Sequence, residues 1–229
     1  MSMSTSRIAR AVAAKDLRIE LRSRVVTNQV LPFSGLVMVM FAFALDNDDV
    51  LQRTAGGLVW LATLFSLFIL VQRTFAVETY DGALDSLRVA GVNPQGIFIG
   101  KSMALFVQLL ILESVLFVAA VVLYRVNVNG SGAVLLVTCV LCATAGLAFV
   151  GTLYGGLTAG ARGRETLLPL LLLPVVAPVL ICATRATESA FRSGGVTVGE
   201  GWPWVAVLAV FAAVFGLGGL LSFGSLIEE

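Results

Sequence analysis

The chain has 229 residues, of which 58% are hydrophobic and only 13% are charged, and its mean hydropathy is +0.96. This composition excludes an ordinary soluble domain, which needs far more polar surface, and it favours a surface that faces lipid. A net charge of +1 gives no overall basic or acidic field, so neither nucleic-acid binding nor an acidic solvating tail is indicated.

The first element is an amphipathic segment at residues 7–24, where basic and apolar side chains alternate. Ile8, Val12 and Ile19 share one face of a helix, whereas two leucines lie on another. This pattern predicts an interfacial helix along the membrane surface. The segment lacks the apolar core and cleavage site of a signal peptide, so we expect the first membrane helix to direct its own insertion.

Six apolar segments are long enough to cross the hydrocarbon core as helices, which takes about 20 residues each. They lie near Val25–Leu45, Ala55–Val71, Ile97–Leu123, Ala133–Leu157, Leu167–Ala183 and Trp202–Phe223. The first is the least regular, because Asn28, Gln29 and Pro32 lie near its start. Only helices or closed barrels satisfy the backbone in lipid, and the segments lack the alternation of barrel strands. We therefore predict an all-α polytopic membrane protein with six transmembrane helices and a single domain, residues 1–229.

Basic residues are unevenly distributed over the connections between these segments. If the N-terminus is inside, only Arg53, Arg125, Arg185 and Arg192 lie outside, and the other 11 of the 15 basic residues lie on the cytoplasmic side. This asymmetry predicts that both termini are cytoplasmic.

The connection between the second and third spans is long enough to hold a short helix at about residues 75–90. On such a helix Glu78, Asp81 and Asp85 lie on one side, while Leu84 and Leu87 lie on the other. Asp81 and Asp85 repel each other at this spacing, so a basic partner surface accounts for them better than water alone. A solvated loop helix is the alternative interpretation.

Three stretches of the chain carry a family resemblance. They are the run from Phe75 to Leu87 followed by Gly100-Lys101, the run from Ala161 through its prolines to Thr184, and the run from Lys15 to Arg24. Together they resemble haem exporter protein B, the permease subunit of the ATP-binding cassette (ABC) transporter for cytochrome c maturation. The resemblance implies an ABC-2-like permease with an N-terminal interfacial helix and a cytoplasmic coupling helix.

The resemblance also implies that the coupling helix docks on a separate ATP-binding subunit, where ATP is hydrolysed. The ATPase-coupling residues would then be Phe75, Glu78, Asp81, Gly82, Leu84, Asp85 and Leu87, together with Arg162 and Arg164 in a second small loop. Plain positive-inside topology, or contact with anionic lipid headgroups, explains the two arginines equally well.

Further partners follow from the same resemblance: a haem-handling membrane subunit and a periplasmic haem chaperone, in the bacterial inner membrane, with two permease copies per complex. The chain would export haem or release the loaded chaperone, and it would carry no catalytic residues. A permease for a lipid, drug or polysaccharide would share these elements. Two other classes of function fit the sequence less well. An intramembrane enzyme would need paired acids, a Ser/His pair or metal ligands in one cavity. A scaffold without a transport function would not need an acidic coupling helix.

Two polar side chains in the third span, Gln108 and Glu113, are intramembrane candidates. An isolated carboxylate there costs several kcal/mol unless it is protonated or partnered. Glu113 is expected to be a functional group or to hydrogen-bond between helices, with Gln108 as one candidate partner. Gly96–Ser102 lacks the spacing of a phosphate-binding loop, so Lys101 is not expected to bind phosphate. Its side chain is expected to extend to the lipid headgroups instead.

No residue is expected to bind a metal or cofactor directly, and haem enters only as a transported or handled ligand. The chain contains no histidine, so the commonest axial ligand of haem is missing. Cys139 and Cys142 have the spacing of a redox motif but lie in an apolar helix, so a structural role is expected.

Glycine and tryptophan positions predict how the spans pack and where they end. Gly151 and Gly155 in the fourth span allow neighbouring helices to approach closely. Trp60, Trp202 and Trp204 lie at the outer ends of predicted spans, where indole rings anchor helices at the interface.

Overall fold

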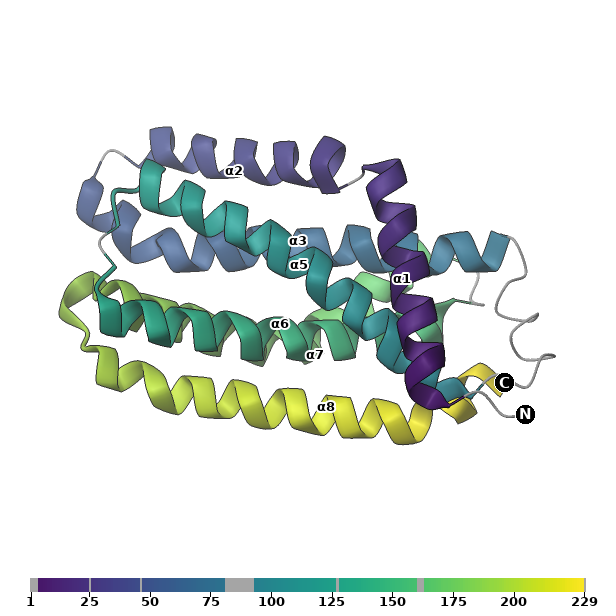
Figure 1. The fold of residues 1–229 in the computed structure, drawn as a ribbon. Helices are drawn as coiled ribbons and strands as arrows, with labels where there is room; N and C mark the ends of the chain where they lie inside the picture. Colours follow the sequence, from purple (N-terminus) through teal and green to yellow (C-terminus); the bar gives the residue numbers. More distant parts are fainter. Residues whose placement is uncertain are drawn as a thin grey trace.

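The computed structural model describes residues 4–24, 26–45, 47–80, 93–126, 128–159 and 163–228. Nearly all of these residues lie in helices, and the described ranges contain no strand. The long helices lie side by side in one bundle, and α1 (Thr5–Ser23) crosses one end of it (Figure 1). The all-α architecture predicted from the sequence is confirmed.

Within the described residues, six helical segments are long and apolar enough to span a membrane, as predicted. They are α2 (Leu31–Ala44), which follows a π-helical turn at Val26–Val30, α3 (Asp48–Tyr80), α5 (Pro94–Leu123), α6 (Gly130–Thr158), α7 (Arg164–Phe191) and α8 (Trp202–Glu228). Several extend beyond the predicted apolar runs, because helical hydrogen bonding continues where hydropathy falls. Asn47, for example, accepts hydrogen bonds from the N–H groups of Asp49 and Val50 and so caps α3 ahead of its apolar part.

Helix α1 packs closely against the first part of α5. Ile8 and Val12 are buried at this contact, where they face Gly96 and Gly100. A Cβ atom at Gly100 would lie 2.6 Å from the carbonyl oxygen of Ala9, so only glycine permits this approach. The two glycines that superficially resemble a phosphate loop are therefore helix-packing positions.

A sharp corner connects α1 to the membrane helices. Arg24 ends α1 in the left-handed conformation, with φ 52°. The N–H group of Val26 donates a 2.6 Å hydrogen bond to a carboxylate oxygen of Glu20. This bond satisfies a backbone donor at the bend and holds the corner.

Glycines in α6 and α8 accommodate aromatic side chains of neighbouring helices. A Cβ atom at Gly155 would lie 2.5 Å from the ring of Phe75 on α3, and one at Gly219 on α8 would collide with Phe98 on α5. At Gly155 in the fourth span, the space that the missing side chain leaves is filled by the aromatic ring of Phe75 and not by a neighbouring backbone.

The interfacial role predicted for Trp60 is wrong. Its side chain is only 1% exposed, and its indole N–H donates a 2.9 Å hydrogen bond to the hydroxyl of Thr187 on α7. Because α3 begins at Asp48, ahead of the predicted apolar run, Trp60 lies well inside the helix. Trp202 and Trp204 at the start of α8 are exposed, as interfacial anchors require.

Candidate functional site

The predicted ATPase-coupling residues lie largely outside the described part of the chain. Those outside it are Asp81, Gly82, Leu84, Asp85, Leu87 and Arg162. Phe75 and Glu78 lie in the last turns of α3, and Arg164 begins α7. Residues 75–80, predicted to begin a separate helix, instead continue the membrane helix, because no glycine or proline interrupts this stretch.

A buried ion pair connects α1 to α5 at this end of the bundle. The ammonium of Lys101 lies 3.4 Å from a carboxylate oxygen of Asp16, and the two side chains are only 1% and 7% exposed. The same ammonium lies 4.6 Å from the centre of the Phe75 ring, close enough for a cation–π interaction. Lys101 therefore contacts both α1 and the end of α3.

The expectation that Lys101 extends to the lipid headgroups is wrong. Its side chain is buried because Gly100 brings α1 against α5 and places Asp16 within reach. Lys15, which is 43% exposed, lies 3.2 Å from the other oxygen of Asp16. The charge of a buried lysine needs such a partner, since desolvation would otherwise disfavour the ammonium.

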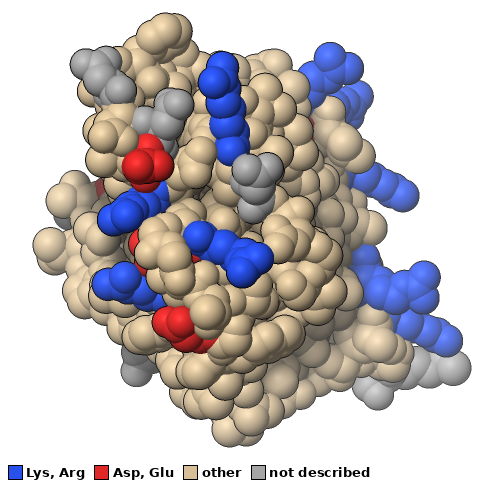
Figure 2. Space-filling view, turned by 90° about the vertical axis from the view of Figure 1, so that its left-hand side faces the viewer, with Lys and Arg blue, Asp and Glu red and all other residues tan. Residues whose placement is uncertain are grey.

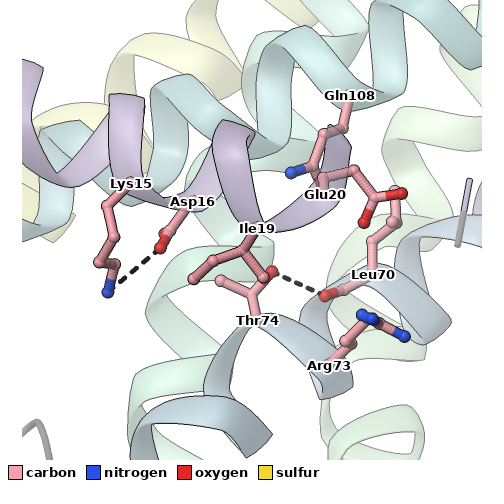
Figure 3. Close-up of a pocket in the computed structure, with 8 residues that line it drawn as sticks. All are labelled: Lys15, Asp16, Ile19, Glu20, Leu70, Arg73, Thr74 and Gln108. Atoms are coloured by element: carbon pink, nitrogen blue, oxygen red, sulfur yellow. Dashed lines mark hydrogen bonds and ion pairs between the residues drawn. The ribbon is translucent and has the colours of Figure 1, made fainter. Parts of the chain in front are cut away.

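A polar pocket lies beside this ion pair, between α1, α3 and α5 (Figure 3). It is lined by Lys15, Asp16, Ile19, Glu20, Leu70, Arg73, Thr74 and Gln108. Charges of both signs meet here, and the lining contains no nucleophile with a neighbouring histidine or similar base.

Gln108 and Glu113, both on α5, do not contact each other. Gln108 lines the pocket against α1 and α3, whereas Glu113 is fully buried and its carboxyl group is hydrogen-bonded to the hydroxyl of Thr144 on α6. The second carboxyl oxygen of Glu113 has no hydrogen-bond partner among the described residues. The interhelical role considered for Glu113 is thus realised with Thr144, and not with Gln108.

Uncharged polar groups also form hydrogen bonds between the membrane helices. The thiol of Cys139 on α6 lies 3.7 Å from the carbonyl oxygen of Ala183 on α7, and Trp60 on α3 bonds to Thr187. Cys139, Cys142 and Cys182 are free thiols. Among the described residues, no three potential ligands of the His, Cys, Asp and Glu type lie close enough to hold a metal ion.

Asp16 was not among the residues singled out by sequence reasoning. Of the two acidic residues of α1, Asp16 and Glu20, only Asp16 is buried. Its partner Lys101 lies 85 positions away along the chain. Periodicity within one helix cannot reveal a pairing of this kind.

Known proteins resemble the chain along most of its length. A family model described as CcmB protein matches residues 7–221. Heme exporter protein B of Rhodobacter capsulatus is 31% identical over 176 residues, which are 75% of this chain and 78% of the relative. The protein of that name from Paracoccus denitrificans is 29% identical over 181 residues (78% and 82%). The one from Pseudomonas aeruginosa is 28% identical over 212 residues (90% and 92%).

Proposed function

The chain belongs to the CcmB protein family, and from this premise we propose that it couples ATP hydrolysis by a partner subunit to haem handling during cytochrome c maturation. It is a multi-pass inner-membrane protein and a transporter membrane subunit in the haem export family. Its own residues supply the transmembrane scaffold and the surface through which motion enters.

The contact of Lys101 with Asp16 and Phe75 is the observation that carries this proposal. Phe75 precedes the connecting segment 81–92 and Lys101 follows it, so the two residues bracket that segment at the inner ends of α3 and α5. Asp16 adds α1 to the same contact. A displacement of the connecting segment by a closing ATPase would therefore move the three helix ends together, as a rigid-body shift.

The chemistry of the connecting segment suits a basic docking surface on the ATP-binding subunit. Asp81 and Asp85 supply acidic groups, together with Glu78 in the last turn of α3, and Leu84 and Leu87 supply an apolar face. Such a helix would sit in a groove of the partner through its leucines and be oriented by its charges. Arg162 and Arg164 would add a second, smaller contact.

Two versions of the step that involves haem are compatible with this coupling. The subunit would move haem across the membrane with a haem-handling membrane subunit, or use its motion to release a periplasmic chaperone loaded with haem. The absence of histidine from the sequence favours the mechanical role. Export of a lipid, drug or polysaccharide is the competing function, and the names of the relatives, heme exporter protein B, disfavour it.

Orientation and stoichiometry complete the proposal. The distribution of lysine and arginine supports a cytoplasmic location of α1 and both termini. Two copies of the chain would assemble with two ATP-binding subunits, since a closing ATPase dimer needs one docking helix on each side.

Co-purification of the ATP-binding subunit tests the docking step. The double variant Asp81→Ala/Leu84→Ala should lose most of the bound ATPase from detergent extracts, because it removes both a charge and the apolar anchor. Covalent cytochromes c should fall in parallel in a strain that depends on the variant. Asp49→Ala is the matched control, since Asp49 is an exposed acid at the other end of the bundle.

Two outcomes would reject this function. Unchanged ATPase co-purification and stimulation in the double variant would exclude docking through the connecting segment. Normal levels of covalent cytochromes c after deletion of the gene would instead favour the permease for another substrate.

A further inference from the structure

A polar cleft opens at the end of the bundle opposite α1. It has a volume of about 440 Å³ and is lined by Gln52, Asn129 and residues 191–197. The cleft thus collects the start of α3, the start of α6 and the loop between α7 and α8 (Figure 1). None of the groups proposed for coupling lies here.

Two arginines border this cleft without a counter-charge. Arg192 lines it, and the guanidinium of Arg53 approaches to 3.3 Å from the position of a Cβ atom at Gly194. Neither arginine forms an ion pair with any described residue. Arg185 on the same end of the bundle is different, because it pairs with Glu188 at 3.1 Å. Figure 2, which faces this end of the bundle, shows basic side chains on it with acidic side chains among them.

The walls of the cleft are fixed by hydrogen bonds and by backbone conformation. The hydroxyl of Ser193 donates to the carbonyl oxygen of Gln52 at 3.1 Å, which fastens the loop to α3. Gly194 and Gly195 have φ values of 69° and 82°, which favour glycine. The absence of a side chain at Gly194 also leaves room for Arg53. The loop is therefore preformed, and the exposed side chains of Arg53 and Arg192 lie at its border.

We propose that this cleft binds the carboxylate groups of a small amphipathic ligand, with Arg53 and Arg192 as the charged contacts and the amide of Asn129 as a neutral donor. Guanidinium groups pair with carboxylates through two parallel hydrogen bonds, which gives both affinity and orientation. In the version of the proposed function in which the subunit itself moves haem, the ligand is haem, which carries two propionate carboxylates on one edge. This identification of the ligand rests on the proposed function.

The position of the cleft favours a ligand from the aqueous phase over a lipid headgroup. Trp202 and Trp204 at the start of α8 are exposed and mark the level of the membrane interface. The cleft loop at residues 191–197 precedes them in the chain and lies beyond the end of α7. The hollow therefore faces water at the edge of the interface, where a soluble carboxylate has access.

A comparison of two porphyrins tests the site. The full-length protein in phosphatidylcholine nanodiscs is titrated with ferric protoporphyrin IX and with its dimethyl ester, and binding is followed by quenching of tryptophan fluorescence. Arg53→Gln/Arg192→Gln should weaken binding of the free acid by about tenfold or more and leave the ester unchanged, because the ester has no carboxylate for the arginines. Gly194→Ala should act in the same direction by displacing Arg53.

Arg185→Gln is the matched control, since it removes an arginine of the same end whose charge is already paired. Equal affinities of the wild type for free acid and ester, or an equal loss in Arg185→Gln, would overturn the proposal. So would loss of wild-type binding in phosphatidylglycerol nanodiscs, which would assign the cleft to lipid phosphates. If Arg53→Gln/Arg192→Gln bound haem as the wild type does but bound an acidic periplasmic protein more weakly, the cleft would be assigned to a protein partner.

The two proposals fail separately. The arginine variants should co-purify with the ATP-binding subunit as the wild type does, because the cleft and the connecting segment lie at opposite ends of the bundle. Loss of ATPase docking in Asp81→Ala/Leu84→Ala tests only coupling. Discrimination between porphyrin acid and ester tests only the cleft.

Discussion

The ammonium of Lys101 and the carboxylate of Asp16 form a buried ion pair at 3.4 Å, although 85 positions separate the two residues in the chain. The pair fastens α1 across one end of the bundle, next to Phe75 on α3. Its position explains how a helix outside the bundle is joined to the ends of α3 and α5. The same pair gives the most direct test of the fold.

Breaking this ion pair should destabilise the protein. Lys101→Met or Asp16→Asn alone should lower the free energy of unfolding by about 3 kcal/mol, because each leaves a buried charge without its main partner. The double variant should lose less than the sum of the single changes, since the partners are removed together. Thermal unfolding in detergent, followed by circular dichroism, measures all three variants.

Lys15→Met is the control for this prediction. Lys15 also contacts Asp16, but its side chain is 43% exposed, so its removal should cost less than about 1 kcal/mol. If the losses of unfolding free energy in Lys101→Met and Asp16→Asn added up in the double variant, the buried ion pair would be contradicted.

Gly100 should be intolerant of even a single methyl group. Gly100→Ala places a Cβ atom 2.6 Å from the carbonyl oxygen of Ala9, so α1 must shift away from α5. We expect a clear fall in the melting temperature and faster proteolysis of α1. Gly218→Ala is the matched control, because a Cβ atom there meets nothing within 4 Å. Equal behaviour of the two variants would argue against the α1–α5 contact.

Glu113 should act as a neutral hydrogen-bonding group. The Thr144 hydroxyl lies 2.6 Å from the Val140 carbonyl oxygen and has only one hydrogen, so the hydrogen between Thr144 and Glu113 is best supplied by the carboxyl group. Glu113→Gln should therefore keep thermal stability and cytochrome c yield near the wild type. Glu113→Ala should lose about 2–3 kcal/mol through the cavity and the lost bond. A Glu113→Gln variant that folds but is inactive would show that the charge itself is needed.

The sequence predicted the elements better than the contacts between them. Hydropathy alone located six spans, because a lipid-facing helix must be apolar along its length. It misjudged Trp60, since α3 extends into polar residues that hydropathy does not count. It also misjudged Lys101, whose burial depends on an acid in a distant helix and on two glycines that admit α1. Contacts between remote residues leave no periodic pattern in a single sequence.

The membrane orientation proposed from basic residues can be measured by cysteine labelling. Single cysteines replace Ser4, before α1, and Asp49, at the other end of the bundle, and both positions are exposed. A membrane-impermeant maleimide should label Asp49→Cys in spheroplasts at once and Ser4→Cys only after permeabilisation, because the charged reagent cannot cross the bilayer and 11 of the 15 basic residues would lie on the inner side. The wild type supplies the background, since its three free cysteines lie in apolar helices. The reverse labelling pattern would show that the proposed topology is inverted. The connecting segment would then lie on the side where no ATP-binding subunit can reach it.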